Sequence, residues 1–371
     1  MGLHAQRSRT QLTPPRLPGS YLVLELTNRC SLACVHCAVS EDGHPHHAHT
    51  GMMAPRIFET VIDDLVEVGG SFDSLVMFWL GEPLLHPFFD RLRRHALRAA
   101  LQHGIFGRIE VHTNATHLGV ERTKALLNQA DIEQVLHFSL DAARTETYRQ
   151  IKGMDRFEKV RANVEHFVSE KARLGARWPR PIFQFIVGSN NVHEAAEFRH
   201  HWEGVCRRNS LPVRASAGVI PPGEDAIVFF RQLDCPTPEL QERENILFRE
   251  EMSTQGLSLP ERAERGRDVK AENLQPCSGF WKSPVVGYRG DLTTCTLDSR
   301  FSNRLGNVLD QPFSQLWWGE RLQGWRDQVA RGDYGGLELC STCFIPHSIN
   351  HADLSEEDVA RQATWAREGA S

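Results

Sequence analysis

The sequence predicts an α/β protein: a partial barrel of six strand–helix units followed by a small cysteine-rich domain. Three observations support this prediction. Apolar strand-like runs alternate with helical patterns through the first 220 residues, which indicates a parallel sheet covered by helices. Six units are too few for a closed eight-unit barrel, so a partial barrel with its chemistry at the C-terminal strand ends fits. Seven of the nine cysteines fall into two spaced sets, one after the first strand and one after residue 276.

Each strand is predicted from a short apolar run, and each helix from apolar residues at helical spacing. The predicted strands are Tyr21–Leu26, Ser74–Leu80, Arg108–His112, Gln134–Leu140, Ile182–Val187 and Val213–Val219. The predicted helices are Pro55–Val68, Pro87–His103, Gly119–Ala130, Arg156–Leu174 and Val192–Asn209. Pro55 and Pro87 would stand in a first helical turn, where the missing N–H of proline has no partner to lose.

The pattern changes after residue 220. Pro221-Pro222-Gly223 ends the strand–helix repetition, and a charge-rich stretch follows with predicted helices at Pro238–Met252 and Pro260–Glu272. A hairpin around Gly290 and a tryptophan-rich helix at Pro312–Val329 come next. The predicted parts are an N-terminal extension (1–20), the barrel (21–220), a linker or capping segment (221–276), the cysteine-rich domain (277–347) and a polar, helical tail (348–371).

Composition limits the classes of function. Of 371 residues, 40% are hydrophobic and 24% charged, which provides a core and excludes disorder as the main state. The net charge of −5 makes a general nucleic-acid binder improbable. The first 20 residues lack the apolar core of a secretory signal, and no run reaches the ~18 apolar residues of a membrane span. We therefore expect a cytoplasmic protein without nucleic-acid or membrane partners, whose cysteines are not disulfide-bonded.

Cys30, Cys34 and Cys37 form a C-x3-C-x2-C pattern directly after the first predicted strand. Three thiolates on one tight loop can hold three irons of a 4Fe–4S cluster, which leaves the fourth iron open to another ligand. The alternatives are a zinc knuckle completed by a histidine, or three unrelated thiols. Structural zinc usually takes four closed ligands, so the iron–sulfur interpretation is favoured.

The second cysteine set lies in the C-terminal domain and consists of Cys277, Cys295, Cys340 and Cys343. Four cysteines can ligate one iron–sulfur cluster completely. A zinc ribbon is the alternative, because paired thiols separated by a long gap also suit zinc. Behind a barrel with the first cysteine pattern, an auxiliary 4Fe–4S cluster is favoured.

These residues resemble the radical S-adenosylmethionine (SAM) superfamily, in which the same cysteine spacing follows the first strand of a partial barrel. The resemblance implies that SAM binds the open iron through its methionyl amine and carboxylate. One electron then cleaves SAM to a 5′-deoxyadenosyl radical, which abstracts a hydrogen atom from the substrate. Leu80-Gly81-Glu82-Pro83 resembles the family's Gly-Gly-Glu-Pro motif, with Leu80 in place of the first glycine.

The resemblance also implies where SAM and the clusters bind. The implied SAM-binding residues are His36, Gly81, Glu82, Pro83, Thr113, Asn114, Ser139 and Asp141. Singly, such strand-end residues are more often turns or caps, but their shared location supports binding. The C-terminal segment resembles the SPASM extension in its one-cluster form, called twitch, because Cys343 is the last cysteine. The implied cofactors are two 4Fe–4S clusters and SAM, with a flavodoxin- or ferredoxin-type electron donor.

Several functions stay open at this point. The favoured one is oxidation of a secondary alcohol of a sugar- or aminocyclitol-like molecule in antibiotic biosynthesis, because the second cysteine set resembles that of one-cluster aminocyclitol dehydrogenases. The alternatives are modification of a ribosomally made peptide, epimerisation or dehydration of a sugar, and a zinc-binding scaffold.

Five further residues or groups are considered for a role. Cys235 is the candidate hydrogen-atom donor of an epimerase, and Arg214 is a candidate catalytic residue facing the barrel together with Glu25. The histidines between His44 and His49 are expected in a solvated loop, and Cys206 in the core.

Overall fold

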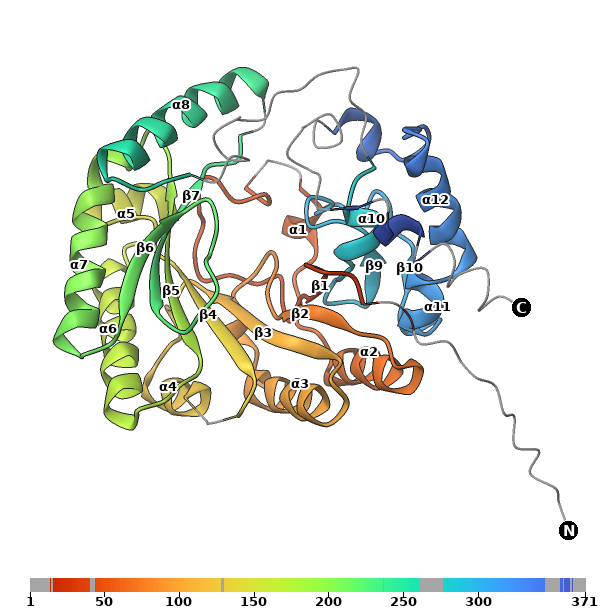
Figure 1. Cartoon of the computed structure of the whole chain (residues 1–371), viewed down its shortest axis with the longest axis horizontal. Coiled ribbons are helices and arrows are strands. Elements are labelled where there is room, and N and C mark those ends of the chain that lie inside the picture. The colour runs from red at the N-terminus through yellow and green to blue at the C-terminus, as the bar shows by residue number, and fades with distance from the viewer. Residues whose placement is uncertain are drawn as a thin grey trace, which may run out of the picture.

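The computed structural model describes residues 14, 16–40, 44–127, 130–235, 237–259, 276–343, 354–355, 357–360 and 362. Within them, ten strands form one sheet in the order β10-β9-β8-β1-β2-β3-β4-β5-β7-β6. The sheet curves around an interior, and helices cover its outer face (Figure 1). The predicted fold class, an α/β partial barrel with a parallel core, is confirmed. None of the helices in the described ranges is long and apolar enough to cross a membrane.

Seven parallel strands form the barrel wall. They are β1 (Tyr21–Leu24), β2 (Phe72–Val76), β3 (Phe106–Thr113), β4 (Glu133–Ser139), β5 (Arg180–Val187), β6 (Val213–Ala217) and β7 (Ala226–Gln232). The first six lie where the sequence predicts them, with ends shifted by a few residues. Side chains alternate between the helix-covered face and the interior of the barrel, as in any strand.

Strand β7 corrects the interpretation of residues 221–276 as a linker. It lies between β5 and β6, parallel to both. Residues 218–225 therefore cross from the end of β6 back to the start of β7 without a helix. Ile220 of this crossover packs against Ile182, Ile227 and Phe229, apart from the main core beneath the helices. The crossover thus fills the interior beside β5 and β7.

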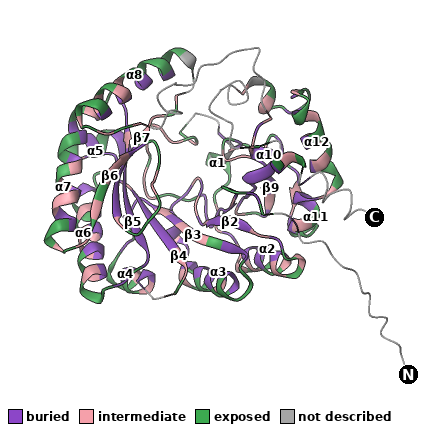
Figure 2. Cartoon of the chain, viewed as in Figure 1, coloured by how far each residue is buried: buried purple, intermediate pink, exposed green. Residues whose placement is uncertain are grey.

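The outer helices begin and end close to the predicted positions. They are α2 (Pro55–Val68), α3 (Phe89–His103), α4 (Val120–Leu126), α5 (Thr145–Lys152), α6 (Phe157–Leu174), α7 (Ala195–Arg208) and α8 (Pro238–Thr254), with a short α1 (Pro45–Ala48) after the first cysteine loop. Helix α5 was not predicted, and the predicted helix Pro260–Glu272 lies outside the described residues. Buried side chains follow the strands and the inward helix faces (Figure 2).

The cysteine-rich segment continues the barrel sheet. Its elements are α10 (Gly279–Lys282), β8 (Val285–Val286), β9 (Asp291–Thr293), β10 (Gly306–Asn307), α11 (Phe313–Trp317) and α12 (Glu320–Ala330). The predicted hairpin is present as β8 and β9, and β8 pairs in parallel with β1. The single helix predicted over Pro312–Val329 is two helices, because the chain is extended at Gly319, where a Cβ would overlap the carbonyl oxygen of Gln315.

Candidate active site

A cavity of about 990 Å³ lies inside the barrel, lined by residues of β1 to β5 and β7 and of the loops at the C-terminal ends of the first strands. The three cysteines Cys30, Cys34 and Cys37 line it from the loop after β1. Thr296 and Leu297, directly after Cys295, line it from the cysteine-rich segment. The first cysteine set therefore lies in the wall of this space, and the second set adjoins it through the residues that follow Cys295.

Helix α5 holds the first cysteine loop in place through backbone hydrogen bonds. The N–H of Ala33 donates to the carbonyl oxygen of Lys152 (3.0 Å), and that of Val35 donates to Ile151 (2.9 Å). Gly153 ends the helix with a φ of 69°, and a Cβ there would lie 3.1 Å from the carbonyl carbon of Ala33. The loop and the end of α5 thus need glycine for their close approach.

A buried ion pair lies beneath this loop. Lys152 Nζ donates to Asp141 Oδ2 (2.5 Å), and the N–H of Ile186 donates to Asp141 Oδ1 (2.7 Å). Burial alone would lower the pKa of Lys152, but the carboxylate of Asp141 outweighs it and raises that pKa. Both oxygens of Asp141 are thus committed to protein groups, so its predicted contact with SAM would compete with this pair. His36 lies 3.8 Å from the same carboxylate, and burial lowers its pKa.

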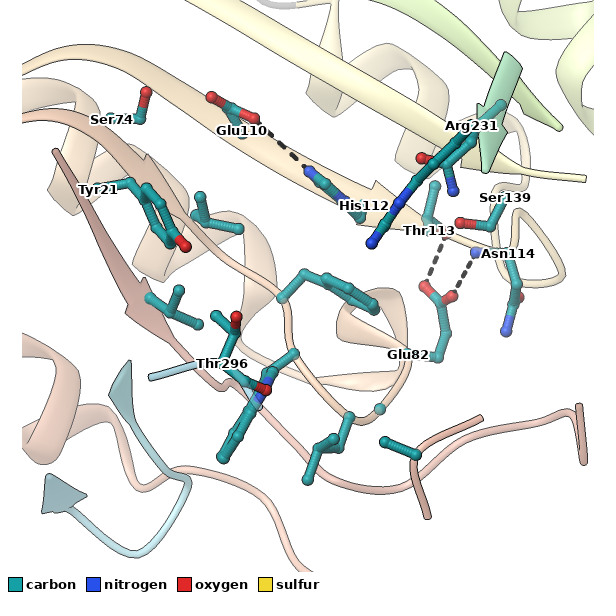
Figure 3. Close-up of a pocket in the computed structure, with 18 of the residues that line it drawn as sticks. Tyr21, Ser74, Glu82, Glu110, His112, Thr113, Asn114, Ser139, Arg231 and Thr296 are labelled. Atoms are coloured by element: carbon teal, nitrogen blue, oxygen red, sulfur yellow. Dashed lines mark hydrogen bonds and ion pairs between the residues drawn. The ribbon is translucent and has the colours of Figure 1, made fainter. Parts of the chain in front are cut away.

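Glu82 is buried at the turn after β2 and fixes the neighbouring strand end. Its carboxylate accepts hydrogen bonds from Thr113 Oγ1 (2.7 Å), Asn114 N (2.7 Å) and Leu84 N (3.0 Å). Burial raises its pKa to about 7, although these donors and Arg122 lower it in part. Glu82 therefore anchors the turn (Figure 3), which leaves backbone groups rather than its carboxylate for a ligand.

Gly81 brings this turn against the loop after β1. A Cβ on Gly81 would overlap the carbonyl oxygen of Thr27 and lie 2.7 Å from that of Arg29. The predicted SAM-binding residues Gly81, Glu82, Thr113, Asn114, Ser139, Asp141 and His36 line the cavity, whereas Pro83 is buried in the turn. Their roles in SAM binding stay predictions.

The first three cysteines fit a metal cluster. Burial, together with the charges of Glu82, Cys34 and Cys37, raises the pKa of Cys30 to about 11. Asn114 Nδ2 lies 3.5 Å from Cys30 Sγ, within hydrogen-bonding distance of a thiolate. A cationic metal cluster would offset the mutual repulsion of three neighbouring thiolates and so favour their ionised form.

The second cysteine set fits a cluster for the same reason. Burial raises the pKa of Cys295 to about 11 and that of Cys340 to about 12, and charge interactions within the set, Cys277 and Cys343 included, add to the shifts. The N–H of Leu297 donates to Cys295 Sγ (3.3 Å), and Asn303 Nδ2 donates to Cys340 Sγ (3.2 Å). The four thiols therefore gather at one place.

The spacing of the thiols bears on the zinc alternative. A single zinc ion with Zn–S bonds of about 2.3 Å holds its thiolates about 3.8 Å apart. In the part of the chain that the structure describes, the three-ligand group within 4.8 Å is Glu110, His112 and His137, and no cysteine belongs to it. In the described residues, therefore, no three sulfurs of either cysteine set all lie within 4.8 Å of one another.

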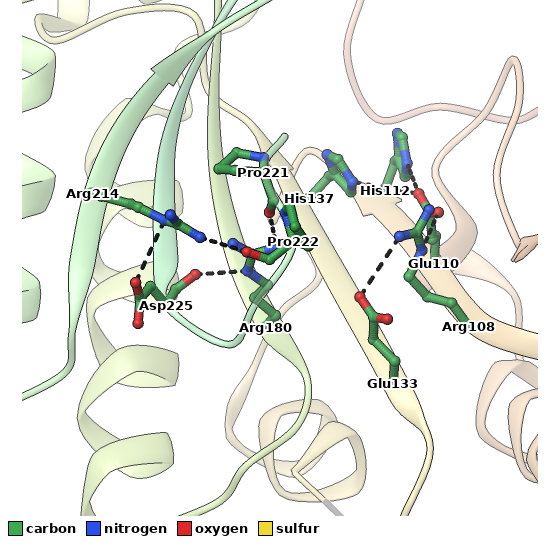
Figure 4. Close-up of polar contacts among 10 residues, drawn as sticks. All are labelled: Arg108, Glu110, His112, Glu133, His137, Arg180, Arg214, Pro221, Pro222 and Asp225. Carbon is green, nitrogen blue, oxygen red and sulfur yellow. Dashed lines mark hydrogen bonds and ion pairs between the residues drawn. The ribbon is translucent and has the colours of Figure 1, made fainter. Parts of the chain in front are cut away.

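Two residues proposed as catalytic lie away from the cavity wall. Arg214, at the start of edge strand β6, donates to the carbonyl oxygen of Pro222 (2.5 Å) and pairs with Asp225 (3.5 Å; Figure 4). Cys235 follows β7, and its N–H donates to Gln241 Oε1 (2.9 Å). Neither is among the described residues that line the cavity; Arg231 of β7 is.

Three other sequence interpretations have clear outcomes. Glu25 faces the cysteine-rich segment, where it accepts from the N–H of Tyr288 (3.1 Å), and burial raises its pKa to about 7. His44 is buried and hydrogen-bonds to Ser299 (3.0 Å), so it is not part of a solvated loop. Cys206 is in the core, as predicted.

Sequence reasoning missed the polar group Glu110, His112 and His137 inside the barrel. The signal was present: Arg108, Glu110 and His112 alternate along β3 and so share the interior face. His137 lies opposite His112 in the pairing of β3 with β4.

Two family models match the chain. The radical SAM superfamily matches residues 24–175, and SPASM, an iron–sulfur cluster-binding domain, matches residues 277–344. The chain therefore contains a radical SAM domain and a C-terminal SPASM domain. These domains imply bound iron–sulfur and SAM.

Individual relatives are distant. The chain is 31% identical over 153 residues to the AdoMet-dependent heme synthase of Methanosarcina barkeri, a match that covers 41% of this chain and only 38% of that relative. Among solved structures, Streptococcus suis SuiB bound to precursor peptide SuiA has a TM-score of 0.56 and 13% identity, covering 91% of this chain and 76% of SuiB. The anSMEcpe structure with bound AdoMet has a TM-score of 0.56 and 16% identity, covering 96% and 97%. These structures share the fold.

Proposed function

We propose that this protein is a radical SAM oxidoreductase that converts a secondary alcohol of a sugar- or aminocyclitol-like molecule into a ketone. The observation that supports the proposal is the shared cavity. Cys30, Cys34 and Cys37 line it on one side, and Thr296 and Leu297, next to Cys295, line it on another. A molecule held there would lie between the two thiol sets.

The cavity suits a small polyhydroxylated molecule beside SAM. Ligand pockets usually have volumes of about 300–1,000 Å³, so a cavity of about 990 Å³ is large enough for two small molecules. Its wall carries hydrogen-bonding side chains, among them Tyr21, Ser74, Glu133 and Gln184. Trp79 closes the side toward the SPASM domain, because its Nε1–H donates to the carbonyl oxygen of Thr296 (2.9 Å).

The proposed overall reaction is balanced in atoms and electrons. One secondary alcohol and one SAM give one ketone, one methionine, one 5′-deoxyadenosine and one proton. When bound, a 4Fe–4S cluster held by Cys30, Cys34 and Cys37 would supply the radical with SAM, and a second one held by Cys277, Cys295, Cys340 and Cys343 would supply an electron acceptor. The protein's own part is to hold both molecules in the cavity and to receive the proton.

The test is anaerobic turnover with scyllo-inositol, scyllo-inosamine and methyl glucoside, each deuterated at the ring carbinol carbons. We expect one of them to give a ketone, with deuterium in 5′-deoxyadenosine. Replacing the four SPASM cysteines by alanine should halve the iron from about 8 per chain by the ligand count and stop ketone formation while 5′-deoxyadenosine still forms.

Three outcomes would contradict the proposal. One is undiminished ketone formation without the four SPASM cysteines. Another is a product of unchanged mass that takes deuterium from heavy water and is lost in Cys235→Ala, which indicates epimerisation. The third is no reaction with any alcohol but a mass change in a peptide.

A further inference from the structure

Glu110, His112 and His137 form a polar group on the interior face of β3 and β4. Glu110 Oε2 lies 3.6 Å from Nε2 of His112 and 3.6 Å from Nε2 of His137. The two imidazole rings stack with centroids 3.9 Å apart and an interplanar angle of 25°. Neither the SAM motifs nor the cysteine sets include these three residues, so their chemistry needs its own explanation.

The stacked rings argue against a mononuclear metal site. A histidine binds metal through the nitrogen lone pair, which lies in the ring plane. A metal shared by two nearly parallel rings 3.9 Å apart would lie about 2 Å out of each plane, far from both lone pairs. The arrangement instead suits proton transfer, in which a carboxylate orients an imidazole.

His112 lies on the cavity wall close to the predicted SAM-binding residues. Asn114, two residues later on the same face, lies 3.5 Å from the sulfur of Cys30. Two strand residues span about 6.6 Å, so His112 lies one layer deeper into the barrel than the cysteine loop. His112 lines the cavity there (Figure 3). Phe78 stacks on its ring at 5.1 Å.

The charges of the group assign different roles to its members. The two imidazoles, each with Nε2 3.6 Å from Oε2, and the Arg108 guanidinium, whose Nε donates to Oε1 (2.7 Å), outweigh burial and hold the pKa of Glu110 well below its usual range. Burial lowers the pKa of His137 to about 4, so this imidazole stays neutral. His137 is 5% exposed, whereas the His112 side chain is 23% exposed and lines the cavity.

We propose that His112 is the proton acceptor of the oxidation and that Glu110 is the positioning residue that orients its ring. This inference rests on the proposed function. After a hydrogen atom leaves the carbinol carbon, the hydroxyl O–H bond breaks and its proton passes to His112, while the remaining electron goes to an iron–sulfur acceptor and the C=O double bond forms. With Nε2–H directed at Glu110, the other ring nitrogen carries the accepting lone pair.

The experiment follows hydrogen abstraction and ketone formation separately, with the deuterated alcohol that the wild-type protein oxidises. In His112→Gln we expect kcat for the ketone to fall by about 100-fold or more, the scale of general-base catalysis, with KM changed less than about threefold. Deuterium should still appear in 5′-deoxyadenosine, so the ratio of 5′-deoxyadenosine to ketone should rise. Added imidazole should restore ketone formation to His112→Ala at least tenfold, which a purely structural defect would not allow.

The matched control is His103→Gln, a change of the same chemistry at an exposed residue of α3 outside the cavity, which should behave as wild type. Ketone formation in His112→Gln at the wild-type rate would overturn the role of His112 and leave the proposed function standing. Equal loss of deuterium transfer and ketone, without imidazole rescue, would also overturn it. A wild-type protein that makes no ketone would refute both proposals.

Discussion

Replacing Lys152 by methionine should destabilise the protein and loosen its first cysteine loop. Lys152 and Asp141 are 3% and 1% exposed, and their atoms are 2.5 Å apart. Methionine keeps the length of the side chain but leaves the carboxylate of Asp141 buried without its cation. Removing one partner of a buried ion pair costs about 3–5 kcal/mol, because the remaining charge loses both water and its counter-charge.

Removing Lys152 alone should cost more stability than removing both members of the ion pair. In Asp141→Asn/Lys152→Met no charge remains, and asparagine tolerates the φ of 59° at position 141 and can still accept from the N–H of Ile186. We therefore expect the double variant to recover most of the stability, to within about 1–2 kcal/mol of wild type.

Thermal unfolding of the reconstituted protein measures this difference. The single variant should unfold about 4–7 °C below wild type, since an unfolding entropy of about 2.1 cal/mol/K per residue makes 1 kcal/mol correspond to about 1.3 °C in a chain of this size. Its iron content should also fall, because Lys152 and Ile151 hold the loop through their carbonyl oxygens. A shift below about 1 °C, or a double variant no more stable than the single one, would refute the reasoning.

Three further predictions follow from the site. In Gly81→Ala, a methyl group would press on the backbone at Thr27 and Arg29, so 5′-deoxyadenosine formation should drop at least tenfold. In Gly104→Ala the φ of +66° strains alanine but the added Cβ meets nothing within 4 Å, so this control should cost about 1 kcal/mol in thermal unfolding and keep that activity. Burial raises the pKa of Glu25 to about 7, above the ordinary 4.3, so the folded state binds the proton of Glu25 more tightly than the unfolded state does. The free energy of unfolding therefore falls, by up to about 3 kcal/mol, as pH rises from about 4.3 to about 7. Glu25→Gln should show a smaller fall in Tm across this pH window, and an unchanged dependence of Tm on pH would contradict the burial argument. Replacing His44 by alanine removes a buried contact to Ser299 and should lower Tm by a few degrees, whereas His47→Ala, at an exposed position of the same segment, should not.

The parts of the fold that sequence reasoning predicted are those with local signals. Helix α2 has proline at its first position and Gly69 at φ 68° just after its end, and both of its bounds were predicted correctly. The cysteine sets and the Gly81-Glu82 turn follow from spacing alone. These features depend on residues close together in the sequence.

The features that were missed depend on contacts across the barrel. Strand β7 carries the buried run Ala226–Phe230, but it follows a proline-rich crossover rather than a helix, so the expected alternation did not reveal it. The pairing of His112 with His137 requires the register of β3 with β4, which the sequence does not state. Arg214 was considered as a residue facing the barrel, yet it contacts the crossover at Pro222 and is not part of the cavity lining, because β7 rather than β6 follows β5 in the sheet.

The pairing of β8 with β1 has a consequence for how the chain could be divided. Although two family models match it, β1 donates backbone hydrogen bonds to Pro284 (2.9 Å) and Val286 (3.0 Å) of the C-terminal segment. A chain cut at residue 276 would leave β1 as a bare, apolar sheet edge with unpaired N–H and C=O groups, which invites aggregation. The two halves are therefore not interchangeable modules: recombination with a foreign SPASM segment would succeed only if that segment also supplied a strand in register with Val23 and Leu24.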